Sequence, residues 1–193
     1  AAVRPILERV AGAPTSWGLC EVPGWGIQLP PERVLPEMSS LGIVATEAGP
    51  DGYLGDDASA IGALLERHGL QLIGGFLPVV LHDPAAREAT LAAARQTAIR
   101  FEALGASFLV SALVVDLDWS TPRPLSREEW KRVYDGFLRL DELHVELTRA
   151  RQRLADRGGR DLVEHHAPHR HLRVQHLPHV PADGLALAVL VRG

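Results

Sequence analysis

The fold of this chain is constrained most strongly by four short apolar segments. Each of them is followed by a longer stretch with the apolar spacing of a helix. Successive segments begin about 30 residues apart, near Val10, Ile43, Leu70 and Phe108. Strands that alternate with helices at this spacing lie parallel in one sheet and are joined by right-handed crossovers. The sequence therefore predicts an α/β fold with the order βαβαβαβα.

Capping residues indicate where the helices between these segments begin. We expect helix starts at Pro31, Asp57, Asp83 and Ser126, because proline and side chains that accept the first N–H groups are typical there. Ser126 is followed three residues later by Glu129, the spacing of a capping box. Four apolar residues behind this box keep helical spacing and are predicted to pack in the core. They are Trp130, Val133, Phe137 and Leu140.

Two architectures fit this alternation, an eight-unit barrel and an open doubly wound sheet. Four units account for about 150 residues, whereas a complete barrel usually takes roughly 250. No G-x-G-x-x-G sequence joins the first strand to its helix. Its absence counts against an open sheet that binds a nicotinamide dinucleotide, but it does not exclude other open sheets.

The composition limits the classes of partner. A length of 193 residues is typical of one domain, and a net charge of −4 offers no polycationic surface for nucleic acid or for a membrane. No apolar run approaches the roughly 18 residues of a membrane span, and no signal peptide opens the chain. A single cysteine, Cys20, excludes an internal disulfide. We therefore expect a cytoplasmic protein that binds neither nucleic acid nor membrane.

The last part of the sequence, residues 158–193, departs from the pattern. Seven of the nine histidines lie between His144 and His179, and only Leu162–Val163 and Leu185–Val191 have the composition of strands. One interpretation is a metal site made by the clustered histidines. The other is an irregular tail, the product of a truncated or out-of-frame gene, and we favour this second interpretation because histidine-rich tracts bind metals loosely.

The stretch from residue 10 to residue 26 contains two tryptophans, one acidic residue and four glycines. Loops that follow strands carry function in α/β folds, so we expect Trp17 to form a pocket wall and Glu21 to contact substrate. Glu47 ends the second apolar segment, where an unpaired carboxylate is costly, and is also expected at the site. His82 follows the third segment and is a candidate to hydrogen-bond substrate, whereas Asp116 is expected in a solvated loop.

Four motifs in this order and spacing resemble the xylose-isomerase-like barrel family. More narrowly, they resemble its branch of sugar phosphate isomerases/epimerases and inosose dehydratases of myo-inositol catabolism. The resemblance runs from about Val10 to Leu143 and implies an incomplete (β/α) barrel of the TIM type, with residues 1–157 as its N-terminal half. The motifs are Gly12-Ala-Pro-Thr-Ser-Trp-Gly18, Cys20-Glu-Val-Pro-Gly-Trp-Gly26, Ala45-Thr-Glu-Ala-Gly-Pro-Asp-Gly52 and Gly75-Phe-Leu-Pro-Val-Val-Leu-His-Asp-Pro84.

The resemblance also implies a chemistry. Members of the family use a divalent metal (Mn, Co, Mg or Zn) to polarise the oxygens of a sugar or polyol, while a carboxylate or histidine moves a proton on the adjacent carbon. This assigns catalytic roles to Glu47 and His82, and substrate binding to Trp17, Glu21, Glu47 and His82. The ligands typically come from later strands, and Glu164 is the one residue here that echoes such a ligand.

Three hypotheses follow. The chain is part of a metal-dependent isomerase, epimerase or dehydratase of sugars or polyols; or it is a non-catalytic half-barrel; or it is a histidine-rich metal-binding module. The second hypothesis rests on the two open sheet edges that four βα units leave, since unpaired edges invite association with another chain.

Overall fold

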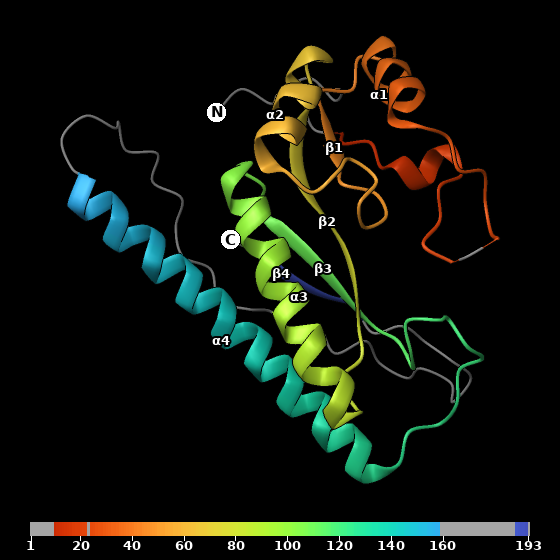
Figure 1. Cartoon of the computed structure of the whole chain (residues 1–193), viewed down its shortest axis with the longest axis vertical. Helices are drawn as coiled ribbons and strands as arrows, with labels where there is room; N and C mark the ends of the chain where they lie inside the picture. Colours follow the sequence, from red (N-terminus) through yellow and green to blue (C-terminus); the bar gives the residue numbers. More distant parts are fainter. Residues whose placement is uncertain (1–9, 23, 159–187, 193) are drawn as a thin grey trace.

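The computed structural model describes residues 10–22, 24–158 and 188–192, with only the main chain described for 144–158 and 188–192. Its strands form one sheet with the order β1-β2-β3-β4. Figure 1 shows the sheet as a narrow layer running between the helices. The strands are β1 (Ala45–Glu47), β2 (Gln71–Val79), β3 (Phe108–Leu113) and β4 (Ala188–Arg192).

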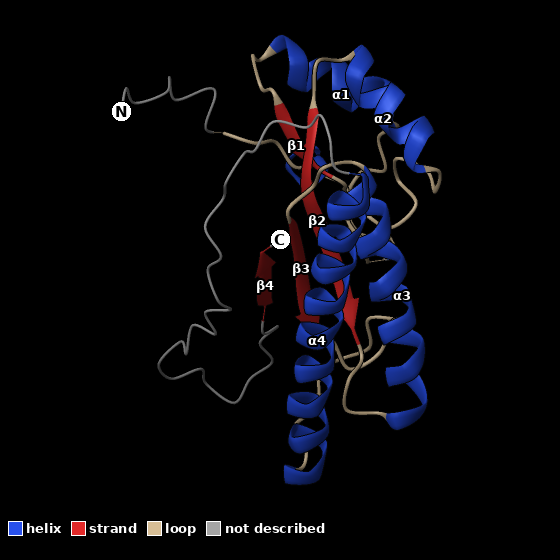
Figure 2. Ribbon diagram, turned by 90° about the vertical axis from the view of Figure 1, so that its left-hand side faces the viewer, coloured by secondary structure: helices blue, strands red, loops and turns tan. Residues whose placement is uncertain are grey.

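In the described residues, four α-helices and one 3-10 helix accompany the sheet. In Figure 2, α3 and α4 lie along one face of β2 and β3, while α1 and α2 lie towards the end of the sheet that carries β1. No helix in the described part of the chain is both long and apolar enough to cross a membrane. The helices are η2 (Pro14–Trp17), α1 (Pro31–Ser40), α2 (Ala58–Arg67), α3 (Pro84–Ala103) and α4 (Arg127–Gly158).

The first three strands are parallel, as the alternation of segments predicts. β1 pairs with β2 from Ala45 opposite Gln71, and β2 pairs with β3 from Gly74 opposite Phe108 to Val79 opposite Leu113. A parallel neighbour requires a long crossover, which α2 and α3 supply. The described residues thus form a partial α/β arrangement, and closure into a TIM barrel stays a prediction.

The prediction of a strand near Val10 is wrong. Its place holds one bridge, in which the Gly12 amide donates to the Ala45 carbonyl at 2.8 Å and the Gly12 carbonyl accepts from the Glu47 amide at 2.9 Å. Pro14 lacks an N–H group and opens η2 two residues later. The chain therefore turns away before a ladder can form.

The far edge of β3 also differs from expectation. β4 pairs with β3 in the antiparallel direction, with Phe108 opposite Arg192 and Ala112 opposite Ala188. This edge, expected to be open, is therefore occupied by a segment of the same chain. The boundary predicted at residue 157 stays a prediction, because α4 runs to Gly158 and residues 159–187 lie outside the described part.

Two apolar clusters hold the layers together. The first joins α1, α2 and the start of β2, with Val34, Leu35 and Met38 fully buried. The second lies under α3 and α4, where Val79 and Leu81 meet Val133 and Leu140. Because both clusters touch β2, this strand carries most of the packing.

The predicted helix starts are confirmed. The Asp57 carboxylate accepts from the Ala60 amide at 2.7 Å, and the Asp83 carboxylate accepts from the Ala85 amide at 2.9 Å. At α4, Glu129 accepts from the Ser126 amide at 2.7 Å, while the Ser126 hydroxyl accepts from the Glu129 amide at 3.2 Å. This is the reciprocal capping box.

The predicted apolar stripe of α4 is wrong in one residue. Val133 and Leu140 are buried and Phe137 packs beside them, but Trp130 is 48% exposed. Trp130 lies in the first turn of α4, which extends past the end of the sheet (Figure 1). Helical spacing identifies the face of the helix but not where along the helix the core ends.

Gly75→Ala is expected to lower the free energy of unfolding by about 1–3 kcal/mol. A Cβ atom at Gly75 would lie 2.7 Å from the Phe101 ring and 2.9 Å from the Ala48 Cβ. Urea unfolding measures the change. Gly62→Ala is the matched control, because its nearest contact is an ordinary 3.5 Å and alanine favours the α2 helix. Equal stability of the two variants would contradict the packing described at Gly75.

Acid is expected to weaken the start of α4 through Glu129. The hydrogen bonds from Arg123 and from the Ser126 amide lower the pKa of Glu129 from 4.5 to about 2. A pKa lowered by folding adds stability above pH 4.5, and this stability is lost as the pH falls towards 2. Urea unfolding between these pH values measures the change. The free energy of unfolding should depend less on pH in Glu129→Gln than in the wild type, and Glu128→Gln should leave this dependence unchanged. Identical slopes in the two variants would count against the capping box.

Candidate functional site

The carboxyl ends of parallel strands meet at one edge of a sheet, where α/β proteins place their sites. In this chain the edge is stepped. β2 and β3 end level with each other, Val79 opposite Leu113, but β1 ends with Glu47 opposite Gly74. Val79 lies five residues beyond Gly74, which corresponds to about 17 Å along a strand. The two predicted catalytic residues, Glu47 and His82, therefore lie at different levels of the edge.

Trp17 lies at the end of η2, beside α1. Its indole N–H donates to the Glu37 carboxylate at 2.8 Å, and its ring packs against the first apolar cluster. The hydrogen bonds from Trp17 and then Arg33 lower the pKa of Glu37. Trp17 thus anchors the predicted loop on α1, and its role as a pocket wall stays a prediction.

The loop that carries Glu21 is closed by a tight main-chain contact. The Ile27 amide donates to the Gly18 carbonyl at 2.7 Å, and Gly26 has a φ of +71°. A Cβ atom at Gly26 would lie 2.0 Å from the Gly18 oxygen, so only glycine fits. Glu21 is half-buried in this loop. Its contact with substrate stays a prediction.

A small cavity lies beyond the end of β1. It is lined by the loop 48–55 and by α3 residues that include Arg100, which forms ion pairs with Asp56 at 3.5 Å and Asp51 at 3.9 Å. The Tyr53 hydroxyl is buried without a hydrogen-bond partner among the described residues, and burial raises the pKa of Tyr53 to about 12. The cavity has a volume of about 30 Å³, which is more than one water requires.

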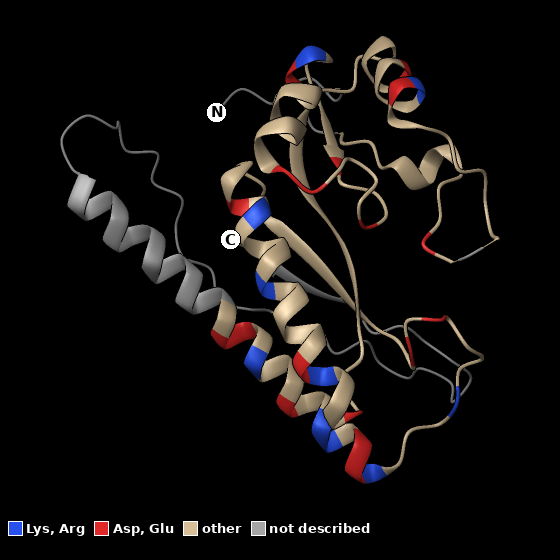
Figure 3. Cartoon of the chain, viewed as in Figure 1, with Lys and Arg blue, Asp and Glu red and all other residues tan. Residues whose placement is uncertain are grey.

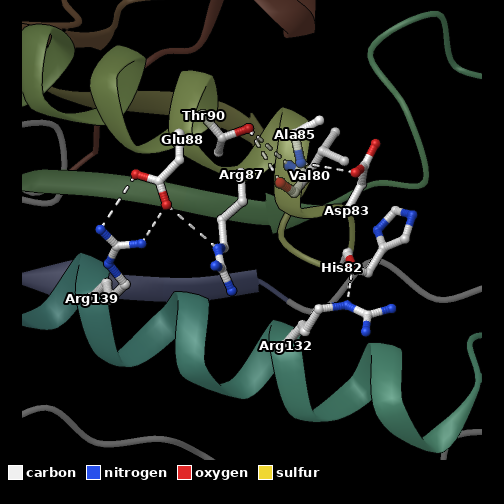
Figure 4. A network of polar contacts seen from close by, with 9 residues as sticks. All are labelled: Val80, His82, Asp83, Ala85, Arg87, Glu88, Thr90, Arg132 and Arg139. Atoms are coloured by element: carbon white, nitrogen blue, oxygen red, sulfur yellow. Dashed lines mark hydrogen bonds and ion pairs between the residues drawn. The ribbon is translucent and has the colours of Figure 1, made fainter.

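His82 follows the end of β2 and is only 4% exposed. Its carbonyl accepts from the Arg132 Nε of α4 at 2.6 Å (Figure 4). Its Nδ1 is buried and has no hydrogen-bond partner in the part of the chain that the structure describes. A buried polar atom without a partner is rare and costly, and such atoms gather at functional sites.

Asp116 follows the end of β3, in a loop where the hydrogen bonds to its carboxylate are exposed to solvent. Its Oδ1 accepts from the Asp118 and Ser120 amides, each at 3.0 Å. Hydrogen bonds from Ser120 and then from Asp118 lower the pKa of Asp116, and the nearby charge of His82 lowers it further. The sequence contains a signal for this pair, because His82 and Asp116 each come three residues after the end of their strand, and the two strands are neighbours in the sheet.

The loop from Asp116 to Ser120 also brings an aromatic ring to the sheet. Trp119 has a φ of +57°, which is uncommon for a residue other than glycine. Its ring stacks on Phe76 of β2, with centroids 6.4 Å apart and planes at 20°. Backbone strain of this kind persists where surrounding contacts hold it, here the two hydrogen bonds to Asp116 and the stack on Phe76.

The described residues contain no group of three or more His, Cys, Asp or Glu side chains that could hold a metal ion. Glu164 and the histidine cluster at 165–179 lie outside the described part. Lys and Arg are interspersed with Asp and Glu along α3 and α4 (Figure 3). Metal binding and the exclusion of nucleic acid both stay predictions.

Trp17→Phe is expected to raise the pKa of Glu37 towards its ordinary value, because the indole N–H is the strongest stabiliser of that carboxylate. Carbon-detected NMR of the side-chain carboxyl measures the change. Trp25→Phe serves as the control, since Trp25 is 68% exposed and hydrogen-bonds through its own main chain. An unchanged pKa of Glu37 in the Trp17 variant would contradict the anchoring role of Trp17.

Comparison with known proteins gives a distant relationship. No protein-family model matches this chain. A protein named inosose dehydratase from Geobacillus kaustophilus (strain HTA426) is 29% identical over 148 residues, which is 72% of this chain and 47% of that protein. The chain thus spans about half the length of the curated relative it matches. The similarity supports a distant relationship to inosose dehydratase.

Proposed function

We propose that this chain belongs to an enzyme that converts a sugar or polyol by moving a proton on the carbon beside a carbonyl group. The observation that carries the proposal is the similarity to inosose dehydratase over 72% of the chain. The parallel edge with a buried histidine agrees with it, because proton transfer needs a titratable group held beside the substrate.

The proposed reaction is a dehydration. A base takes the proton from the carbon next to the carbonyl, and the hydroxyl group on the following carbon leaves with a proton as water. A keto-polyol therefore becomes an unsaturated ketone plus water, and no redox partner is needed. Isomerisation or epimerisation begins with the same proton removal and returns the proton to a different position.

His82 is the described residue that fits the proton carrier best. It lies at the edge where β2 and β3 end together, and its buried Nδ1 has no partner among the described residues. Glu47 is the last residue of β1 and lies opposite Gly74, so it does not reach the level at which β2 ends. We assign Glu47 to the part of the edge that meets the Trp17 loop, through its main-chain bond to Gly12.

A divalent metal remains part of the proposal, but the described residues do not fit one, since they offer no group of three ligands. No step is therefore derived through a metal. Association through an open edge likewise stays a prediction, and β4 occupies one of the two edges on which it rested.

The test is turnover of a panel of keto-inositols and ketoses by the full chain, with Mn²⁺, Co²⁺, Mg²⁺ or Zn²⁺ and with a chelator. His82→Gln is expected to lower kcat by about 100-fold or more, the usual contribution of a general acid–base group. His68→Gln is the matched control, because His68 lies after α2 at the opposite end of β2. No turnover with any metal, or equal rates for the two variants, would contradict the proposal.

A further inference from the structure

We infer that Asp116 and Arg132 complete a proton-transfer site around His82, with Asp116 as the charge partner of the imidazole and Arg132 as a positioning residue. Only the catalytic part of this inference, proton transfer to a substrate, rests on the proposed function. The inference adds a carboxylate from the loop after β3, which the sequence predicts only as a solvated side chain, and an arginine from α4.

Strand register places His82 and Asp116 after the paired ends of two neighbouring strands. Val79 pairs with Leu113, and the Val114 amide donates to the Val79 carbonyl at 3.0 Å, so the two strands leave the sheet side by side. His82 and Asp116 each come three residues after this last pair. Glu47 cannot take the place of Asp116, because it lies opposite Gly74, well before the level of Val79.

Asp116 is held in one place and kept ionised. Two amides of its own loop donate to Oδ1, and the loop is pinned to the sheet by the stack of Trp119 on Phe76. These hydrogen bonds, with the charge of His82, keep the pKa of Asp116 below its ordinary value. A carboxylate that stays ionised beside an imidazole stabilises the protonated ring that forms when the ring takes a proton.

Arg132 fixes the main chain on which the imidazole stands. It donates to the His82 carbonyl from a residue 50 positions away, and it is half-buried. Its position depends on the capping box that starts α4 one turn earlier. Because Arg132 binds the carbonyl, it leaves the ring Nδ1 without a partner among the described residues.

The other charged groups near His82 have different partners. The Asp83 carboxylate caps α3 through the Ala85 amide. Glu88 lies between Arg87 and Arg139 and ties α3 to α4 (Figure 4). The imidazole of His82 extends away from this network in the same figure. Asp116 thus combines a place after the paired end of β3 with a pKa that the charge of His82 helps to lower.

The first test measures how Arg132 holds His82. The full chain is treated with diethyl pyrocarbonate at pH 7, and the modification rate of His82 is followed by peptide mass spectrometry with the half-buried His68 as internal reference. Arg132→Gln is expected to raise the His82 rate severalfold, and Arg132→Lys to restore protection in part, because an ammonium group also donates to the carbonyl.

Arg139→Gln is the matched control for this experiment. Arg139 lies two turns further along α4 and binds α3 through Glu88 rather than His82. Its variant should leave the His82 rate unchanged while loosening the helix pair to a similar degree. Equal His82 rates in the Arg132 and Arg139 variants would overturn the positioning role.

The second test measures the charge partnership. Carbon-detected NMR follows the titration of Asp116 in the wild type, His82→Gln and His68→Gln. Because the charge of His82 is one of the causes that lower the pKa of Asp116, its removal in His82→Gln should raise that pKa, and His68→Gln should leave it unchanged. An unchanged pKa of Asp116 in His82→Gln would overturn the role of Asp116 as the charge partner of His82.

Activity provides the third readout. Asp116→Asn is expected to lower kcat about tenfold or more with KM within about twofold, whereas Asp118→Asn, on an exposed side chain of the same loop, should keep both constants. Equal kcat values for these two variants would contradict the role of Asp116. A wild type without turnover would contradict the proposed function alone, because the labelling and the titration still decide the arrangement around His82.

Discussion

The close approach of β2 to its neighbours at Gly74 and Gly75 is the constraint on which the rest of this structure depends. A Cβ atom at Gly74 would lie 2.2 Å from the Phe108 carbonyl oxygen, and one at Gly75 would meet the Phe101 ring at 2.7 Å. Two adjacent glycines let the β3 backbone approach from one side and α3 pack from the other. Their pairing with Phe108 and Leu109 sets the register of the whole β2–β3 ladder.

This register decides which side chains share the functional edge. With Gly74 opposite Phe108, β2 and β3 end together, and His82 and Asp116 each follow these paired ends by three residues. The same Gly74 faces Glu47, the last residue of β1, so that carboxylate lies at an earlier level. α4 then reaches the edge from outside the sheet, and Arg132 binds the chain at His82.

Local sequence signals predicted those parts of the fold that depend on neighbours in the chain. The caps at Asp57, Asp83 and Ser126 were predictable because a side-chain oxygen two or three residues from a free N–H group is a local arrangement. The expected strand near Val10 failed because Pro14 ends pairing after one bridge. Trp130 was misplaced because helical spacing does not tell where the sheet beneath the helix ends.

The sequence by itself determined the alternation of strands and helices, the parallel direction of β1, β2 and β3, and the place of a histidine just after β2. These depend on apolar spacing and on capping residues, both of which act over a few positions. Only the tertiary structure decided that Asp116 rather than Glu47 follows a strand that ends level with β2, and that Arg132 binds the His82 carbonyl from 50 residues away. The physical reason is strand register, which packing between distant segments sets and which a single strand does not encode.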